Sequence, residues 1–215
     1  MSINAISTVA ILVHGFNVTA PAWTVGKFRK PFEALGCLVE EFNYGYWPYP
    51  WQLTKRNPKF AKQLAERCRY WKSQNYRVVV VGHSNGAAIV RLACTIHSAR
   101  MDRVLAVQPA LRQESSVCDQ VDRVLVVHND GDRTVVLGRL LGRITKLVRM
   151  DSWRFRPWGK MGRYGYVGTR QNHINIDTDS DIYPEEVRAR GHSTLFKENL
   201  ASYWLPYLAD LVVNK

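Results

Sequence analysis

The sequence is short of acidic residues. It has 18 Asp and Glu against 30 Lys and Arg, which gives a formal net charge of +12 at pH 7. A positive field of that size attracts nucleic acid, anionic lipid or an acidic polymer, although the charge could also serve solubility alone. Arginine is concentrated between Arg139 and Arg170, in a segment that also holds several aromatic residues: Trp153, Phe155, Trp158, Tyr164 and Tyr166.

Long apolar runs are missing. The longest fall short of the about 20 residues that a helix needs to cross a bilayer, so we expect no membrane span. The start, MSINAISTVAILVHGF, has no basic segment and no small-residue cleavage site before its apolar run, which stops at His14. We therefore expect no signal peptide and a cytoplasmic protein.

Cysteine is scarce, and its spacing is not that of a metal site. The four cysteines lie in apolar or helical patterns without any C-x-x-C pair, at Cys37, Cys68, Cys94 and Cys118. We expect buried free thiols rather than disulfides or zinc ligands.

Two other ligand motifs are incomplete. DTDSD at 177–181 opens like a calcium loop, but position six is Ile182 instead of Gly and position twelve is Arg188 instead of Glu. GRYGYVG at 162–168 does not join a strand to a helix, as a dinucleotide-binding loop would. We expect neither a metal nor a cofactor.

Short runs rich in valine and leucine recur along the chain, each followed by glycine or by polar, turn-forming residues. They predict buried strands at 8–13, 37–42, 77–82, 103–108 and 123–128. Segments with helical spacing alternate with them, at 21–35, 58–70, 87–96 and 193–213. This order predicts an α/β fold, a mostly parallel sheet with helices on both faces, in one compact domain over residues 1–215.

The stretch GHSNG at 82–86 follows the apolar run RVVVV and precedes an alanine-rich helical segment. In the pattern G-x-S-x-G, a strand enters a sharp turn and a helix leaves it, which raises the serine hydroxyl above the carboxyl ends of the strands. Gly82 and Gly86 supply the room for that turn. Because the flanking segments match as well as the five letters, we interpret Ser84 as a nucleophile rather than as an ordinary turn residue.

A nucleophilic serine needs a base, and the base needs an acid that fixes its tautomer. In the chain order serine, acid, histidine, the base precedes the last helix. His192 in RGHSTLF fits, with Ser193 as a candidate helix cap, and His173 is the reserve. The acid belongs in HNDGDRTVV, where Asp130 and Asp132 both have the right order.

The motif HGFN at 14–17 follows the first predicted strand. It would place the backbone N–H of Phe16 opposite the nucleophile, with the N–H of Asn85 as the second donor to an oxyanion. Gly15 would let the backbone approach that closely.

Together, VHGF, VVGHSNGA, HNDGDRTV and RGHSTLF resemble the motifs of serine hydrolases of the α/β-hydrolase superfamily, and the resemblance covers nearly the whole chain. The compact build is similar to small lipase-like or esterase-like proteins, including ones encoded by bacteriophages. The resemblance implies an α/β-hydrolase fold with little or no cap domain, and metal-independent hydrolysis of carboxylic esters through an acyl-enzyme.

The resemblance also assigns roles to residues. It makes Ser84 the nucleophile, His192 the base and Asp132 the acid, with the N–H groups of Phe16 and Asn85 as oxyanion donors. It prefers Asp132 to Asp130 because the acid in these proteins is followed by two residues and then an apolar position, which here is Val135.

Two segments, 43–57 and 150–170, could act as lids. The first contains NYGYWPYPW, whose aromatic residues lie near the edge where open α/β sheets bind ligands. They could wall an acyl pocket, with Tyr46, Trp47 and Trp51 touching substrate, or they could simply pack against one another.

Two classes of function remain. The first is a hydrolase of small-molecule or lipid esters that could also meet an anionic surface. The second is a binding protein on the same fold, whose basic aromatic segment engages an anionic polymer or nucleic acid. The complete set of Ser84, Asp132 and His192 favours the enzyme, and we do not expect nucleic acid. The motifs do not define the acyl chain or the alcohol, because pocket shape selects them.

Overall fold

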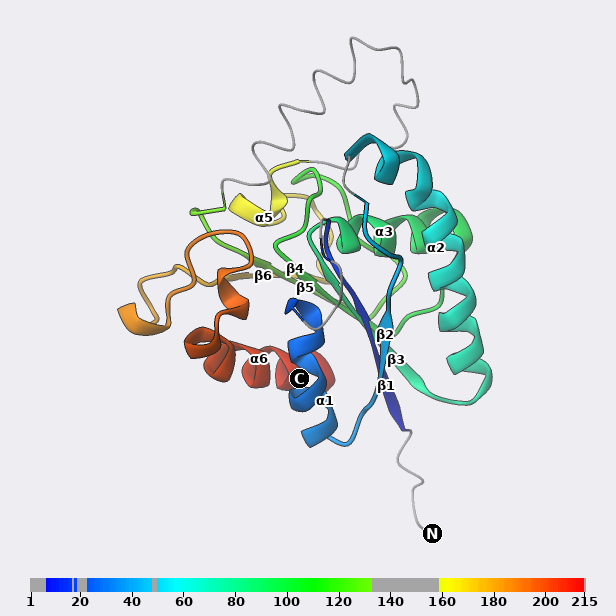
Figure 1. The fold of residues 1–215 in the computed structure, drawn as a ribbon, viewed down its shortest axis with the longest axis horizontal. Coiled ribbons are helices and arrows are strands. Elements are labelled where there is room, and N and C mark those ends of the chain that lie inside the picture. The colour runs from blue at the N-terminus through cyan, green and yellow to red at the C-terminus, as the bar shows by residue number, and fades with distance from the viewer. Residues whose placement is uncertain (1–6, 17, 19–22, 48–49, 133–158, 215) are drawn as a thin grey trace.

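The computed structural model describes residues 7–16, 18, 23–47, 50–132 and 159–214, without the side chains of residues 50–54. Within these residues a parallel sheet of six strands forms the centre, in the order β2-β1-β3-β4-β5-β6 (Figure 1). The strands are β1 (Thr8–Val13), β2 (Leu38–Phe42), β3 (Arg77–His83), β4 (Arg103–Val107), β5 (Arg123–His128) and β6 (His173–Asp177). The sheet confirms the predicted fold class.

Valine and other branched residues dominate the central strands because both faces of a parallel sheet are covered. Successive side chains of a strand point to opposite faces. In β1, Ile11 and Val13 therefore join one buried cluster, while Ala10 and Leu12 join the other. β6 is the strand that the apolar runs did not predict, because its HINID sequence interleaves isoleucines with polar residues.

Helices cover both faces of this sheet (Figure 1). α2 (Pro50–Ser73) and α3 (Asn85–His97) bury their apolar stripes in the first cluster. The 3-10 turn η2 (Val25–Phe28), α1 (Arg29–Ala34) and α6 (Glu198–Val213) cover the second cluster. The alternating strands and helices of the sequence thus fold into three layers, with the sheet between two layers of helices.

The helix boundaries differ from the prediction in three places. The segment predicted as helical at 21–35 is the 3-10 turn η2 followed by α1, and residues 21–22 lie outside the described chain. α2 begins at Pro50, so residues 50–57 are helix and the aromatic loop is shorter than 43–57. At the C-terminal end the 3-10 turn η5 (Thr194–Phe196) comes first, and Lys197 occupies the N-cap position of α6. Ser193 therefore does not cap that helix.

The segment 150–170, predicted as an irregular loop or hairpin, is described from residue 159 onwards. There the chain forms the short helix α5 (Met161–Tyr164). The N–H of Met161 donates to the Leu111 carbonyl, and the N–H of Asn129 donates to the Gly162 carbonyl, so α5 is held beside the carboxyl end of β5. Most of the basic segment between Arg139 and Arg170 lies outside the described residues.

The expectation of four free thiols is wrong for one pair. Cys94, in the last turns of α3, and Cys118, in the β4–β5 connection, form a disulfide with their Cα atoms 5.7 Å apart. The topology brings the end of α3 against that connection, a proximity that residue spacing alone does not reveal. Cys37 and Cys68 are free and buried, as expected.

In the described part of the chain, no helix is long and apolar enough to cross a membrane.

Candidate active site

Ser84 occupies the turn between β3 and α3, at the carboxyl edge of the sheet. Its backbone has φ 52° and ψ −117°, a conformation that is costly for any residue with a side chain. The turn is anchored on both sides, because the Ser84 N–H donates to Val107 O and its carbonyl accepts from the N–H groups of Ala87 and Ala110. A strained serine between a strand and a helix is the geometry that the G-x-S-x-G pattern predicts.

Glycines make this turn possible because neighbouring backbone fills the space of a side chain. A Cβ on Gly82 would lie 2.9 Å from Cα and N of Ala87. A Cβ on Gly86 would lie 2.6 Å from the His14 carbonyl oxygen. At Gly15, a Cβ would lie 2.8 Å from His83 Nδ1 and 3.1 Å from Ser84 Cβ, so the HGF loop packs directly against the serine.

Asp132 and His192 are brought together. His192 Nδ1 lies 2.9 Å from Asp132 Oδ2. The Asp132 side chain is fully buried, whereas the predicted alternative, Asp130, is exposed. His192 in turn lies beside the serine turn, because its ring centroid is 4.9 Å from that of His83, the residue before Ser84. Ser84, Asp132 and His192 therefore lie on adjoining loops at one edge of the sheet.

Two buried amides hold the backbone on either side of His192. Gln108 Nε2 donates to the Gly191 carbonyl at 2.7 Å, and its Oε1 accepts from the Ser193 N–H at 2.8 Å. Asn129 Oδ1 accepts from the Gly191 N–H at 2.8 Å. Gln108 itself has φ 45°, another strained non-glycine position at a strand end. Sequence reasoning did not single out either amide, because Gln108 is the last residue of the strand predicted at 103–108 and Asn129 belongs to the loop considered only for the acid.

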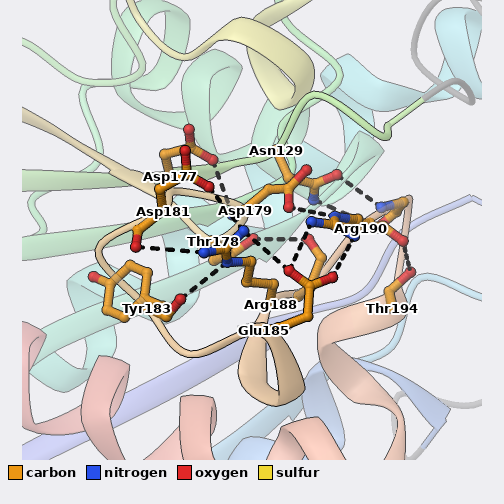
Figure 2. Close-up of polar contacts among 12 residues, drawn as sticks. Asn129, Asp177, Thr178, Asp179, Asp181, Tyr183, Glu185, Arg188, Arg190 and Thr194 are labelled. Atoms are coloured by element: carbon orange, nitrogen blue, oxygen red, sulfur yellow. Dashed lines mark hydrogen bonds and ion pairs between the residues drawn. The ribbon is translucent and has the colours of Figure 1, made fainter.

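Ion pairs shape the segment that leads from β6 to His192 (Figure 2). Arg190 pairs with Asp179 and Glu185, and Arg188 pairs with Asp181 and Glu185. Two of the three carboxylates of DTDSD, those of Asp179 and Asp181, are therefore partners of arginine side chains. Each pair has at least one solvent-exposed partner and so adds little stability alone, but together the pairs fix the path of the loop.

The loop is also tied down at both ends. The Thr178 N–H donates to His128 O, and the Ala189 N–H donates to Thr178 O, which closes the segment on itself. Thr194 Oγ1 donates to the Arg190 carbonyl at 2.8 Å, just beyond His192 (Figure 2). Within the described residues, no group of three or more His, Cys, Asp or Glu is arranged to hold a metal ion.

The predicted oxyanion donors lie on two facing elements. Asn85 is the first residue of α3, where backbone N–H groups have no partner within the helix and the helix dipole is positive. Phe16 follows Gly15 on the loop after β1, partly buried against the first apolar cluster. The Asn85 side chain is buried and paired with Asn57 of α2.

Burial keeps the neighbouring histidines neutral. It lowers the pKa of His83 well below the ordinary histidine value, with further lowering from the charges of His192 and His14. Burial also lowers the pKa of His14, against weaker opposing hydrogen bonds from Gly15 and Asn43. Two neutral imidazoles beside the turn add no positive charge that would compete with a base.

The reserve base, His173, lies elsewhere. It belongs to the edge strand β6, where its Nε2 accepts from the Val117 N–H at 3.0 Å and its ring stacks on Tyr166. Asp132 contacts His192 instead.

The aromatic loop is placed only in part. Tyr46 is exposed, and Trp47 packs on Phe60 beneath the Arg56 guanidinium, which lies 4.0 Å from its ring centroid. Tyr49 and the side chain of Trp51 lie outside what the structure describes. Tyr44, which the sequence interpretation passed over, is buried.

No family model and no curated protein matches the chain by sequence. Several solved structures match its fold. A structure of Est1E from Butyrivibrio proteoclasticus with ferulic acid bound has a TM-score of 0.57 at 13% identity, over 100% of this chain and 93% of the other.

Two proteins from Xanthomonas campestris give similar results. For an α/β serine hydrolase without a lid, the TM-score is 0.56 at 12% identity, with 98% and 83% of the two chains covered. For a protein of the α/β-hydrolase superfamily, it is 0.52 at 16% identity, with 95% and 97% covered. The chain therefore has the α/β-hydrolase fold. Identities this low carry no more than the fold.

Proposed function

We propose that this protein is a serine hydrolase that cleaves carboxylic esters through an acyl-enzyme intermediate. The observation that carries the proposal is the buried Asp132 carboxylate 2.9 Å from His192 Nδ1, beside a serine in the strained turn between β3 and α3. A nucleophile, a base and an acid at one edge are the set that acyl transfer requires.

The proposed roles follow from the contact between Asp132 and His192. When Nδ1–H donates to the carboxylate, the free lone pair of the imidazole is on Nε2, which can take the proton of Ser84 Oγ. The alkoxide-like oxygen then bonds to the ester carbonyl carbon. The tetrahedral oxyanion would accept hydrogen bonds from the N–H groups of Phe16 and Asn85.

Collapse of this intermediate breaks the bond to the alcohol oxygen, which receives the proton from His192. Water then repeats the sequence: its proton goes to His192, its oxygen bonds to the acyl carbon, and Ser84 leaves with the proton returned. The chemistry needs no metal and no cofactor. The acid is released and the enzyme is restored.

Substrates would enter at the carboxyl edge of the sheet, where open α/β sheets bind ligands. We propose that Tyr46, Trp47 and Trp51 contact the acyl or alcohol group of a small-molecule or lipid ester. The structure of Est1E, which this chain resembles in fold, holds ferulic acid, a carboxylic acid of the kind that ester hydrolysis releases. The segments 43–57, whose second half is the start of α2, and 150–170 remain the proposed lid elements of a single domain.

A binding protein on this fold would use the basic aromatic segment instead. Binding a polymer through that segment would not require the strained Ser84 backbone or the buried pair of Asp132 and His192. Both features cost free energy to maintain. We therefore prefer the enzyme.

A panel of p-nitrophenyl esters of increasing acyl length, with a thioester and an amide beside it, tests the proposal. The wild-type protein should hydrolyse at least one ester, and Ser84→Ala should not. Absence of turnover on every ester, or equal turnover by both proteins, would contradict the proposed function.

A further inference from the structure

The loop after β1 contains a peptide group whose orientation decides whether one oxyanion donor exists. A trans peptide unit is planar, so its C=O and its N–H point in opposite directions. The described peptide bonds are all trans. The direction of the Gly15 carbonyl therefore sets the direction of the Phe16 N–H.

The Gly15 carbonyl is held on its buried side by Tyr44. The Tyr44 hydroxyl donates to Gly15 O at 2.7 Å and lies 3.1 Å from His14 O. Burial raises the pKa of Tyr44, with a smaller opposite effect from its hydrogen bond with Asn85, so the hydroxyl keeps its proton at neutral pH.

His14 reinforces this arrangement. Its Nδ1 lies 2.9 Å from Gly15 O, while its Nε2 lies 3.3 Å from the backbone N of Tyr44 and 3.2 Å from Asn43 Oδ1. A neutral ring with the proton on Nδ1 donates to the Gly15 carbonyl and accepts from the Tyr44 N–H. The ring also stacks on Tyr44 with centroids 4.0 Å apart, so the two side chains hold each other in place.

The same hydroxyl contacts the side chain of Asn85, whose backbone N–H is the second proposed donor. Asn85 Nδ2 lies 3.4 Å from Tyr44 Oη, and the Asn85 amide pairs in both directions with the amide of Asn57, at 2.9 and 3.2 Å. All three side chains are buried. Tyr44 thus connects the Gly15–Phe16 peptide with the first residue of α3 behind the serine turn.

We propose that Tyr44 is a positioning residue that keeps the Phe16 N–H directed into the active site by holding the Gly15 carbonyl away from it. The inference rests on the proposed function, since it concerns the oxyanion site of that reaction. If the peptide turned over, the Phe16 N–H would leave the site and a carbonyl oxygen would replace a donor. Losing one donor of this kind lowers kcat by about a hundredfold or more.

Tyr44→Phe tests the proposal, because it removes the hydroxyl and keeps the ring that stacks on His14. Tyr76→Phe is the control, since Tyr76 is a partly buried tyrosine that packs on Trp71 just before the amino end of β3, at the opposite edge of the sheet from Ser84. Two quantities are measured on the best p-nitrophenyl ester: kcat per titrated active site, and the inhibition constant of an alkyl boronic acid, which forms a tetrahedral adduct with an active serine.

We expect Tyr44→Phe to lower kcat about tenfold or more, with KM nearly unchanged, and to weaken the boronic acid by the same factor. Tyr76→Phe should match the wild type in both. Replacing Tyr44 with 4-aminophenylalanine, which keeps a donor at the same place, should restore most of the loss. If Tyr44→Phe does not fold, His14→Phe gives the same readout, because it removes the other hydrogen bond to the Gly15 carbonyl and keeps a ring that stacks on Tyr44.

A purely structural role would lower the melting temperature and leave kcat and boronic acid binding of the folded enzyme unchanged. That result, or an aminophenylalanine variant as slow as the phenylalanine variant, would overturn the proposal for Tyr44 alone. A wild-type protein that neither turns over esters nor binds the boronic acid would instead overturn the proposed function.

Discussion

His192 Nδ1 and Asp132 Oδ2 lie 2.9 Å apart, although 60 residues separate them in the chain. The carboxylate has no exposed surface, so the contact takes place out of bulk water, where a hydrogen bond to a charged group is strong. It selects the Nδ1–H tautomer of His192 and leaves Nε2 free to accept a proton.

Asp132→Asn should therefore lower kcat by about four orders of magnitude while the protein stays folded, because an amide can favour the wrong histidine tautomer. Asp130→Asn is the matched control: this residue is exposed, two positions away, and should keep nearly full activity. Steady-state kinetics on both variants is the measurement. If Asp130→Asn were inactive and Asp132→Asn active, Asp130 would be the acid instead. If both variants were active, the acid would be another residue.

Gln108→Ala should lower kcat about ten- to a hundredfold, since it releases the Gly191 carbonyl and the Ser193 N–H that bracket His192. Gln120→Ala, an exposed glutamine in the β4–β5 connection, is the control. Labelling of Ser84 by a fluorophosphonate should slow by a similar factor. Unchanged kinetics for Gln108→Ala would show that the loop carrying His192 keeps its position without the two Gln108 hydrogen bonds.

Acid should destabilise the fold through His173. Burial lowers its pKa to about 4, with smaller effects from Asp119 and Arg170, whereas an unfolded histidine titrates near 6.5. Between these values the unfolded chain binds a proton that the folded chain does not, so the free energy of unfolding falls as pH falls from about 6.5 to about 4. Above that window the stability is fully present.

His173→Gln should flatten this part of the curve, because glutamine does not titrate and its oxygen can still accept from the Val117 N–H. Urea unfolding at a series of pH values gives the two curves. His14 and His83 contribute a slope of the same sign in both proteins, so the difference isolates His173. Parallel curves would remove this explanation. The variant should hydrolyse esters at the wild-type rate, and an inactive one would reinstate His173 as the base.

The sequence was most informative where local pattern and structure coincide. Five strands could be predicted because a parallel sheet that is covered on both faces needs continuous apolar runs. The G-x-S-x-G turn could be recognised because steric crowding requires glycine at two fixed positions. β6 was missed, since an edge strand tolerates the polar residues His173 and Asn175. Pro58 suggested a helix start, yet α2 runs through it from Pro50.

Contacts between distant segments could not be predicted. The disulfide between Cys94 and Cys118 depends on where α3 ends relative to the next connection. Gln108 meets the His192 loop across 83 residues, and Tyr44 meets Gly15 across 29. For Gln108 and Tyr44 the available signal was a polar side chain soon after a strand, but its partner is set by topology rather than by spacing.

The most direct test of the account is covalent labelling of the wild-type protein with a fluorophosphonate, followed by peptide mapping by mass spectrometry. The phosphorus forms a bond to an activated serine oxygen and loses fluoride, so the reaction reports a working nucleophile and base without knowledge of the substrate. The account predicts a single adduct on Ser84, lost in Ser84→Ala, in heat-denatured protein and largely in His192→Ala. An adduct on another serine, or none on the folded wild-type protein, would contradict it.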